Sequence, residues 1–200
     1  MNVQISLTDF VDFVIKTGPP RLTKVKEVKN RDEYHPAFDF WKPLRDGLEV
    51  FHKQEKDFDY LYNIALKQKD SRKRTKYPLA INTYKKFIGR KQVKWFDPPK
   101  SKWLNDGLIV NINPELGLYI NNVPHVIKLF FKDDKLDKRK TEVVFCLMQD
   151  ELSSDAPPGA VMSILDIREG RLITPTKPPD DIFVLLKAEA NTFIQIWNAL

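Results

Sequence analysis

The spacing of apolar residues changes halfway along the chain. In the first half they recur every three or four positions, as Trp41, Leu44, Leu48 and Phe51 do, and this period is typical of helices with one buried face. In the second half, short apolar runs are separated by turn residues, which is typical of strands. The change predicts an α+β fold, in which a helical N-terminal half is followed by a mixed β-sheet.

The first half contains four candidate helices. Ser6 and Asp39 can cap the first two, because each precedes an apolar stripe. Pro78 has no amide hydrogen and fits best in the first turn of a helix, so we expect the fourth helix to start there and a loop to precede it. The predicted helices cover residues 6–17, 40–54, 58–68 and 78–88, the predicted loop covers 69–77, and residues 21–33 stay ambiguous.

The second half is predicted to form a sheet with a crossover helix. Three strands follow one another closely and should form a meander, which a helix then connects to two further strands. The predicted strands cover residues 108–113, 117–120, 126–131, 161–167 and 172–173, and the predicted helices cover 136–152 and 180–197. Two hundred residues can bury a sizeable core. We therefore expect one compact domain, with a helical, basic part at 1–97 and a sheet part at 98–200.

Positive charge is concentrated in the first half of the chain. Residues 1–100 contain 22 Lys and Arg against 13 Asp and Glu, whereas residues 101–200 contain 11 against 14. Within residues 67–94 the only acid is Asp70, and the basic residues there are Lys67, Lys69, Arg72, Lys73, Arg74, Lys76, Lys85, Lys86, Arg90, Lys91 and Lys94. Such a charge density attracts polyanions. The alternative interpretation is a solvated helix surface with a polar loop.

Aromatic residues lie beside this basic stretch. An exposed ring can stack on a nucleic-acid base while lysines and arginines hold the phosphates. Trp95, which directly follows Lys94, and Trp103 are the aromatic candidates for such a role; the alternative for both is a place in the core. We therefore predict nucleic-acid binding by the eleven basic residues and Trp95.

The order of the predicted elements resembles the PD-(D/E)XK, or restriction-endonuclease-like, nucleases. In that family an acid on the second strand and an acid-x-lysine on the third hold a divalent metal ion that activates water. Lys128 in the strand 126–131 matches the family lysine, but Val126 stands where the family has an acid. The earlier acid corresponds to Asn111, Asn113 or Glu115. The resemblance implies a nuclease-like scaffold whose chemistry is degraded; a different α+β fold is the alternative.

Other kinds of site find little support. A single cysteine, Cys146, excludes a disulfide framework and a cysteine-based zinc site. The three histidines have no metal-ligand spacing, and the chain has no glycine-rich phosphate-binding motif. We therefore expect no metal site and no cofactor.

Three hypotheses for the function follow. The first is a nucleic-acid-binding protein, for DNA or RNA, on a nuclease-like scaffold without robust catalysis. The second is a protein-interaction module, such as an accessory or regulatory subunit of a bacterial or phage system. The third is a metal-dependent nuclease with an atypical motif that uses Glu115, Asp106 and Lys128 with magnesium. The longest apolar runs are only a few residues, so we expect no membrane association and a cytoplasmic protein.

Overall fold

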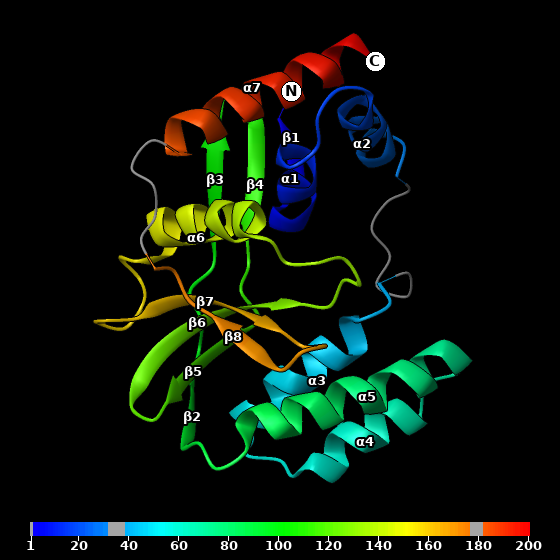
Figure 1. Ribbon diagram of the computed structural model, residues 1–200, viewed down its shortest axis with the longest axis vertical. Helices are drawn as coiled ribbons and strands as arrows, with labels where there is room; N and C mark the ends of the chain where they lie inside the picture. The colour runs from blue at the N-terminus through cyan, green and yellow to red at the C-terminus, as the bar shows by residue number, and fades with distance from the viewer. Residues whose placement is uncertain (1, 32–38, 177–181) are drawn as a thin grey trace.

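Two β-sheets lie one above the other in the computed structural model, which describes residues 2–31, 39–176 and 182–200 (Figure 1). The smaller sheet has the strand order β1-β4-β3 and consists of β1 (Val3–Ser6), β4 (Leu108–Ile112) and β3 (Ser101–Asn105). The larger sheet has the order β2-β5-β6-β7-β8 and consists of β2 (Val93–Phe96), β5 (Leu116–Ile120), β6 (Val123–Phe130), β7 (Val161–Asp166) and β8 (Arg171–Ile173).

The larger sheet is mixed, as expected. Strands β6 and β7 run parallel, and the helix α6 (Lys138–Leu152) connects them, whereas the other neighbouring pairs in this sheet are antiparallel. The predicted crossover helix and the predicted α+β class are therefore confirmed.

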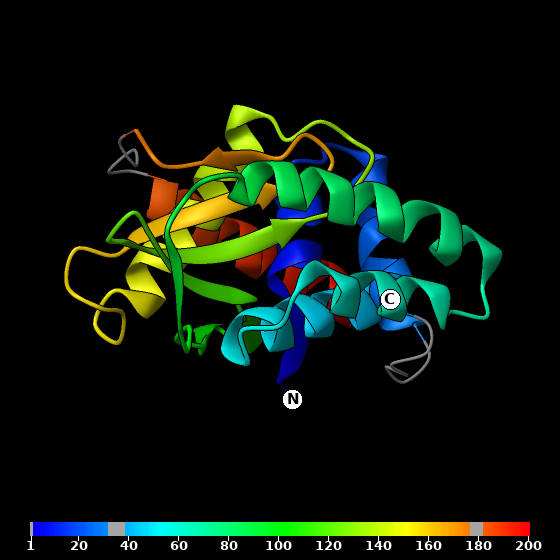
Figure 2. The same ribbon diagram turned by 90° about the horizontal axis from the view of Figure 1, so that it is seen from below.

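The helices pack in two groups, one for each sheet. In the upper half of Figure 1, the smaller sheet packs with α1 (Leu7–Val14), α2 (Pro19–Lys29), α6 and α7 (Ile182–Ala199). In the lower half, one face of the larger sheet is covered by α3 (Lys42–Lys53), α4 (Phe58–Leu66) and α5 (Ser71–Ile88), as Figure 2 shows from below. In the part of the chain that the structure describes, no helix is both long and apolar enough to span a bilayer.

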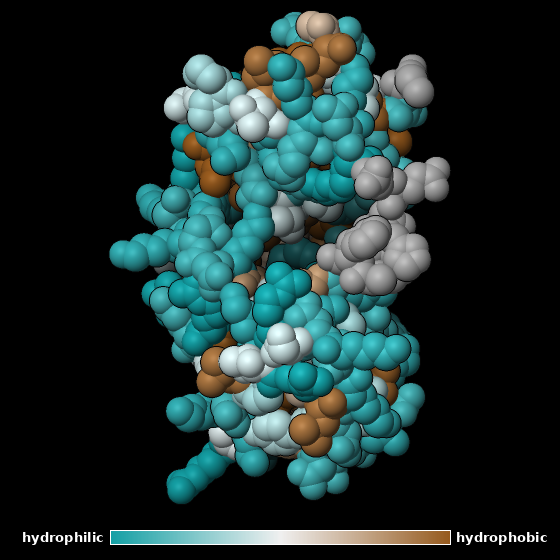
Figure 3. Space-filling view, turned by 90° about the vertical axis from the view of Figure 1, so that its right-hand side faces the viewer, coloured by the Kyte–Doolittle hydropathy of each residue, from teal (hydrophilic) through white to brown (hydrophobic). Residues whose placement is uncertain are grey.

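Strand β6 connects two hydrophobic cores, because its side chains alternate between the faces of the sheet. Val126 belongs to the first core, which the smaller sheet shares, and Ile127 and Leu129 belong to the second core, beneath α3–α5. The space-filling view shows a hollow where the two halves of the molecule meet, on a mostly hydrophilic face (Figure 3).

The division expected at residue 97 does not separate the cores. Val3 and Phe10, near the N-terminus, pack in the first core with Trp103 and Phe193. The second core joins α3–α5 to strands of the sheet part in the same way. Both parts of the chain therefore contribute to both cores.

The expected three-stranded meander is wrong in its first strand. Residues 108–112 form β4, which pairs with β1 and β3, and the outer neighbour of β5 is β2 instead. Gly117 explains how closely β2 lies: a Cβ atom there would stand 2.3 Å from the Phe96 carbonyl oxygen. The absence of a side chain at this position therefore permits the β2–β5 pairing.

The expected loop 69–77 is also wrong, because α5 begins at Ser71 and contains Pro78 in its interior. The Asp70 side chain caps the helix by accepting a hydrogen bond of 2.8 Å from the Arg72 amide. Tyr77 is fully buried, and its hydroxyl donates a hydrogen bond to the carbonyl oxygen of Phe40. This packing of Tyr77 stabilises the first two turns of α5. It offsets the loss of the helix hydrogen bond that Pro78, which has no amide hydrogen, cannot donate.

Candidate nucleic-acid interface

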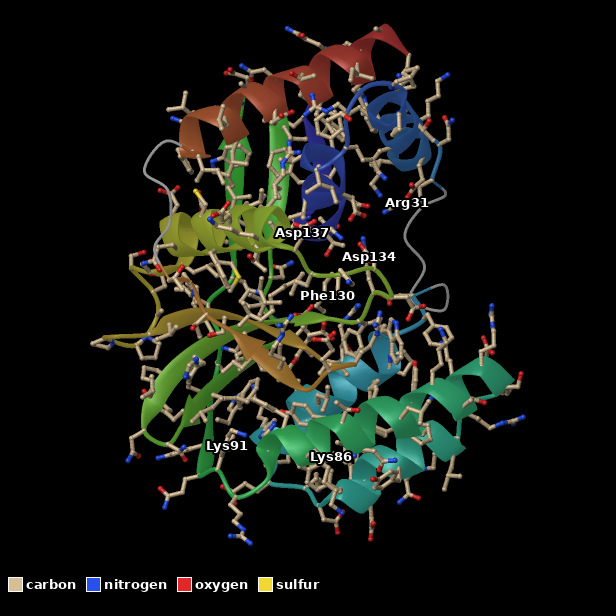
Figure 4. The ribbon with its side chains drawn as sticks, in the orientation of Figure 1. Arg31, Lys86, Lys91, Phe130, Asp134 and Asp137 are labelled. Atoms are coloured by element: carbon tan, nitrogen blue, oxygen red, sulfur yellow. The ribbon has the colours of Figure 1, made fainter. Side chains whose placement is uncertain are left out.

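The eleven basic residues of 67–94 form what we call the basic surface. They lie at the end of α4, along α5, in the connection to β2 and on β2 itself, all in the lower half of the molecule. Lys86 and Lys91 mark the region where α5 ends in Figure 4. The chain thus brings these residues together on one helix and its two ends.

Most cations of the basic surface have no ion pair within the part of the chain that the structure describes. Among the described residues, its ion pairs are Arg72 with Asp70 at 2.9 Å and Lys76 with Asp133 at 3.5 Å. Ion pairs elsewhere engage twelve basic residues, which are Arg21, Lys24, Arg31, Lys42, Arg45, Lys53, Lys128, Lys132, Lys138, Lys140, Arg168 and Arg171. The basic surface therefore has unusually little internal compensation for this molecule.

Ring and carbonyl contacts hold three further members of the basic surface. The ammonium groups of Lys73 and Lys85 lie 5.6 and 5.3 Å from the ring centres of Phe40 and Phe58. The Lys91 ammonium donates a hydrogen bond to the carbonyl oxygen of Phe87. These contacts orient the side chains without adding a carboxylate partner from the described residues.

Helical spacing places part of the basic surface on a single face of α5. Arg72, Lys76 and Lys86 share that face with Leu79 and Thr83, because these positions are three or four residues apart. With a rise of 1.5 Å per residue, Arg72 and Lys86 are about 20 Å apart along the axis. Arg74 and Lys85 lie on another exposed side, so the cations form more than one row.

Trp95 has a half-buried position on the edge strand β2. It packs against the second core, and its indole nitrogen donates a hydrogen bond of 3.3 Å to Asp97. Trp95 is thus close to Lys94 in the chain but partly engaged by the protein. Stacking of Trp95 on a base stays a prediction.

Lys128, on β6, lines a small pocket together with residues of α1 and α6. Its ammonium donates hydrogen bonds to Glu115 at 2.6 Å and to the Asn113 carbonyl oxygen at 3.2 Å. The other Glu115 carboxylate oxygen accepts the Leu129 amide at 2.8 Å. Both side chains of the pair are about one-sixth exposed, 17% and 16%. The sequence placed Glu115 and Lys128 in one candidate site, but it did not predict that the two would form an ion pair.

A second basic side chain lies near the Glu115 carboxylate. The Arg45 guanidinium approaches Glu115 to 4.0 Å and pairs more closely with Asp39 at 2.6 Å. Val126, on the same face of β6 as Lys128, is fully buried in the first core. Magnesium prefers several oxygen ligands that include carboxylates. Within 2–31, 39–176 and 182–200, no group of three or more His, Cys, Asp or Glu side chains is placed to hold a metal ion.

Asp106 does not join Glu115 and Lys128. It lies in the turn between β3 and β4 with a positive φ of 39°, whereas Glu115 follows the opposite end of β4. Five strand residues span about 16 Å. The three residues of the nuclease hypothesis are therefore not one cluster.

A buried ionic network ties α1 to α2 and was not foreseen from the sequence. Asp9 accepts hydrogen bonds from Arg31 at 2.9 Å, Lys24 at 3.0 Å and the Ser6 hydroxyl at 2.7 Å. Burial alone would raise the pKa of Asp9, but these bonds and the charge of Lys24 hold it well below its usual range. The network fixes α1, α2 and the residues that follow α2 relative to each other.

Acidic side chains also hold the loop before α6, through an ion pair and a helix cap. Asp134 pairs with Lys140, and Asp137 caps α6 by accepting the Lys140 amide at 2.9 Å. Figure 4 labels both acids, at the loop that leads into α6. The acidic groups of this region are thus occupied by neighbouring cations and amides.

Comparison with known proteins found no matching family model, no similar curated protein and no similar solved structure. Fold and site therefore define the protein by class: an α+β protein with a basic helix surface and a separate lysine–glutamate pair.

Proposed function

We propose that the protein binds nucleic acid through the basic surface on and around α5. The observation that carries this proposal is the low internal pairing of that surface, because nine of its eleven cations have no carboxylate partner in the described chain. Unpaired, exposed lysines and arginines release the counterions of a nucleic acid when they contact its phosphates. Such contacts depend little on base sequence.

The charge in the first turn of α5 supports the proposal. Arg72, Lys73 and Arg74 lie beside the positive end of the helix dipole, where cations disfavour the helix. A bound phosphate would compensate both the dipole and these side chains. Asp70 compensates them only in part, through its cap and its pair with Arg72.

The proposal assigns no metal-dependent cleavage to the protein. The nuclease-like scaffold stays part of the proposal, and what supports it is the crossover helix α6 between the parallel strands β6 and β7, with Lys128 on β6. Val126 replaces the family acid, and the carboxylate of Glu115 is bound by Lys128 and the Leu129 amide. The proposed place of action is the cytoplasm.

A variant that removes unpaired charge tests the proposal. Lys69, Arg74, Lys86 and Arg90 are exposed and have no ion pair within the described residues, so their replacement by glutamine should not disturb folding. We expect the fourfold variant to bind a labelled single-stranded DNA at least about tenfold more weakly in a fluorescence anisotropy titration.

The matched control carries the same four-charge change elsewhere. Lys26, Lys100, Lys102 and Lys135 are also exposed and without ion pairs in the described chain. Their replacement by glutamine should weaken binding much less. Equal losses in both variants would show that only net charge matters, and unchanged affinity in the first variant would contradict the proposal.

An exposed apolar area on α7 favours a second candidate function. Val184 and Leu185 on this helix are 69% and 62% exposed. Neighbouring apolar side chains on a surface are typical of protein–protein contacts. A protein-interaction module is therefore the alternative function. It would be supported if the protein bound a protein partner saturably and the substitutions Val184→Ser and Leu185→Ser abolished that binding.

A further inference from the structure

A pocket opens directly beside the face of α5 that carries Arg72, Lys76 and Lys86. Its cavity volume is about 270 Å³. Its apolar lining comes from four separate segments: Trp41, Leu79 and Ala80, Phe131, and Ile167. Since these segments are distant in the chain, no sequence pattern indicated the pocket.

Two aromatic rings of the lining, Trp41 and Phe131, stack on each other, and Trp41 also stacks on Tyr77, which is buried and does not line the pocket. The Trp41 ring centre lies 4.7 Å from that of Phe131 and 5.4 Å from that of Tyr77, with 20° between the planes in each pair. Leu79 forms part of the wall and is nonetheless 62% exposed. An exposed leucine beside an aromatic stack can gain apolar contact from a ligand.

Polar groups of both kinds surround this apolar lining. Lys76 and Arg168 flank the Asp133 carboxylate at 3.5 and 3.6 Å, so the edge has a net positive charge. The Arg168 guanidinium is oriented by a hydrogen bond of 2.9 Å to the Lys132 carbonyl oxygen. The Thr83 hydroxyl donates to the Leu79 carbonyl oxygen and keeps lone pairs that can accept.

The pocket has the size and chemistry of a site for one planar ring system. Its volume lies just below the range of pockets for drug-sized ligands, which begins at about 300 Å³. A nucleobase has an apolar face and an edge with donors and acceptors. The cations on either side of Leu79 and Thr83 would hold the phosphates that precede and follow the base.

We propose that this pocket binds one unpaired nucleobase of a single-stranded nucleic acid whose phosphates contact the basic surface. The inference rests on the proposed function and names its substrate as single-stranded. A base in a duplex is stacked and paired, so it can enter a pocket only after it is unpaired. The net positive edge and the row of cations favour this polyanion as the occupant.

The experiment compares two single strands with the same phosphates. One is a labelled DNA decamer, and the other is an abasic decamer with the same sugar-phosphate chain. We expect the unmodified protein to bind the decamer with bases more tightly. Leu79→Ala should weaken binding of that strand by about fivefold and leave binding of the abasic strand unchanged.

Leu66→Ala serves as the matched control. Leu66 on α4 is 73% exposed and does not line the pocket, so the same truncation there should change neither affinity. Equal affinity of the unmodified protein for both strands would overturn the base pocket and leave the proposed function standing. An equal loss for both strands in Leu79→Ala would overturn it too.

Two further outcomes concern the proposed function itself. If neither strand binds at low salt, the proposed function fails and the base pocket fails with it. If an acidic peptide with an aromatic residue binds instead, and Leu79→Ala abolishes that binding, the pocket belongs to a protein partner. That result would also overturn the inference.

Discussion

Lys128 shows that a charged residue within an apolar strand predicts an ion-pair partner or access to solvent. Its neighbours Val126, Ile127 and Leu129 are apolar and buried, so a lysine among them needs an acidic partner or a route to solvent. The structure provides both in part, through Glu115 and a side chain that is 17% exposed. The partner is 13 residues away in the chain, across the β5–β6 pair, and only the strand register determines it.

Lys128→Met should lower the free energy of unfolding by about 2 kcal/mol, less than the 3–5 kcal/mol typical of a fully buried pair. The Leu129 amide and the Arg45 guanidinium still compensate Glu115, which reduces the loss. Urea denaturation of Lys128→Met, Glu115→Gln and the double variant measures it. We expect the double variant to be less destabilised than the two single effects combined; strict additivity would contradict the pairing.

His52 predicts a pH dependence of stability. Burial lowers the pKa of His52 from 6.5 to about 4 in the folded protein, where its ring contacts the Tyr84 hydroxyl. Between these values the unfolded chain binds a proton and the folded protein does not. Stability therefore falls as the pH drops from 6.5 towards 4, by about 3 kcal/mol in all. Above pH 6.5 both states are neutral and this contribution is absent.

His52→Gln isolates this effect. Urea denaturation of the unmodified protein and the variant at pH 7 and pH 4.5 measures the change between the two pH values, so a constant loss of stability in the variant does not matter. The change should be smaller in the variant. Equal changes would show that His52 titrates normally in the folded protein.

At the scale of elements, local patterns predicted helices and strands well where one buried face dominated. Residues 42–53 and 58–66 form helices, and 116–120 and 161–166 form strands, close to the expected bounds. Element α5 was misjudged at its start, because Pro78 is usually a boundary. Here Tyr77 and Asp70 hold the turns before it, through burial and capping that a local pattern does not reveal.

Pairing between strands was predicted less well than the strands themselves. Strand β4 pairs in parallel with β1, more than a hundred residues earlier, and β1 has only four residues. Strand β2 reaches β5 across the insertion of β3 and β4. Such long-range partners depend on tertiary packing, so neighbouring strands in the sequence seemed the better partners.

At the scale of the whole molecule, charge was predicted and the pocket was not. The order of charged residues in the sequence located the basic residues of 67–94. The structure places them at the end of α4, along α5, in the connection to β2 and on β2. The pocket beside α5, which Trp41 and Phe131 help to line, forms only where four segments of the folded chain meet. The charge of the basic surface can therefore be predicted from the sequence, whereas the pocket beside it can be found only in the folded structure.

The salt dependence of nucleic-acid affinity tests the central claim most directly. Each phosphate contact on a single strand contributes about −0.7 to the slope of log K against log salt concentration. With at least four contacts at the basic surface, we predict a slope of about −2.8 or steeper for the unmodified protein and a labelled single-stranded decamer. Failure to bind at 50 mM salt, or an affinity that does not change with salt, would contradict the account.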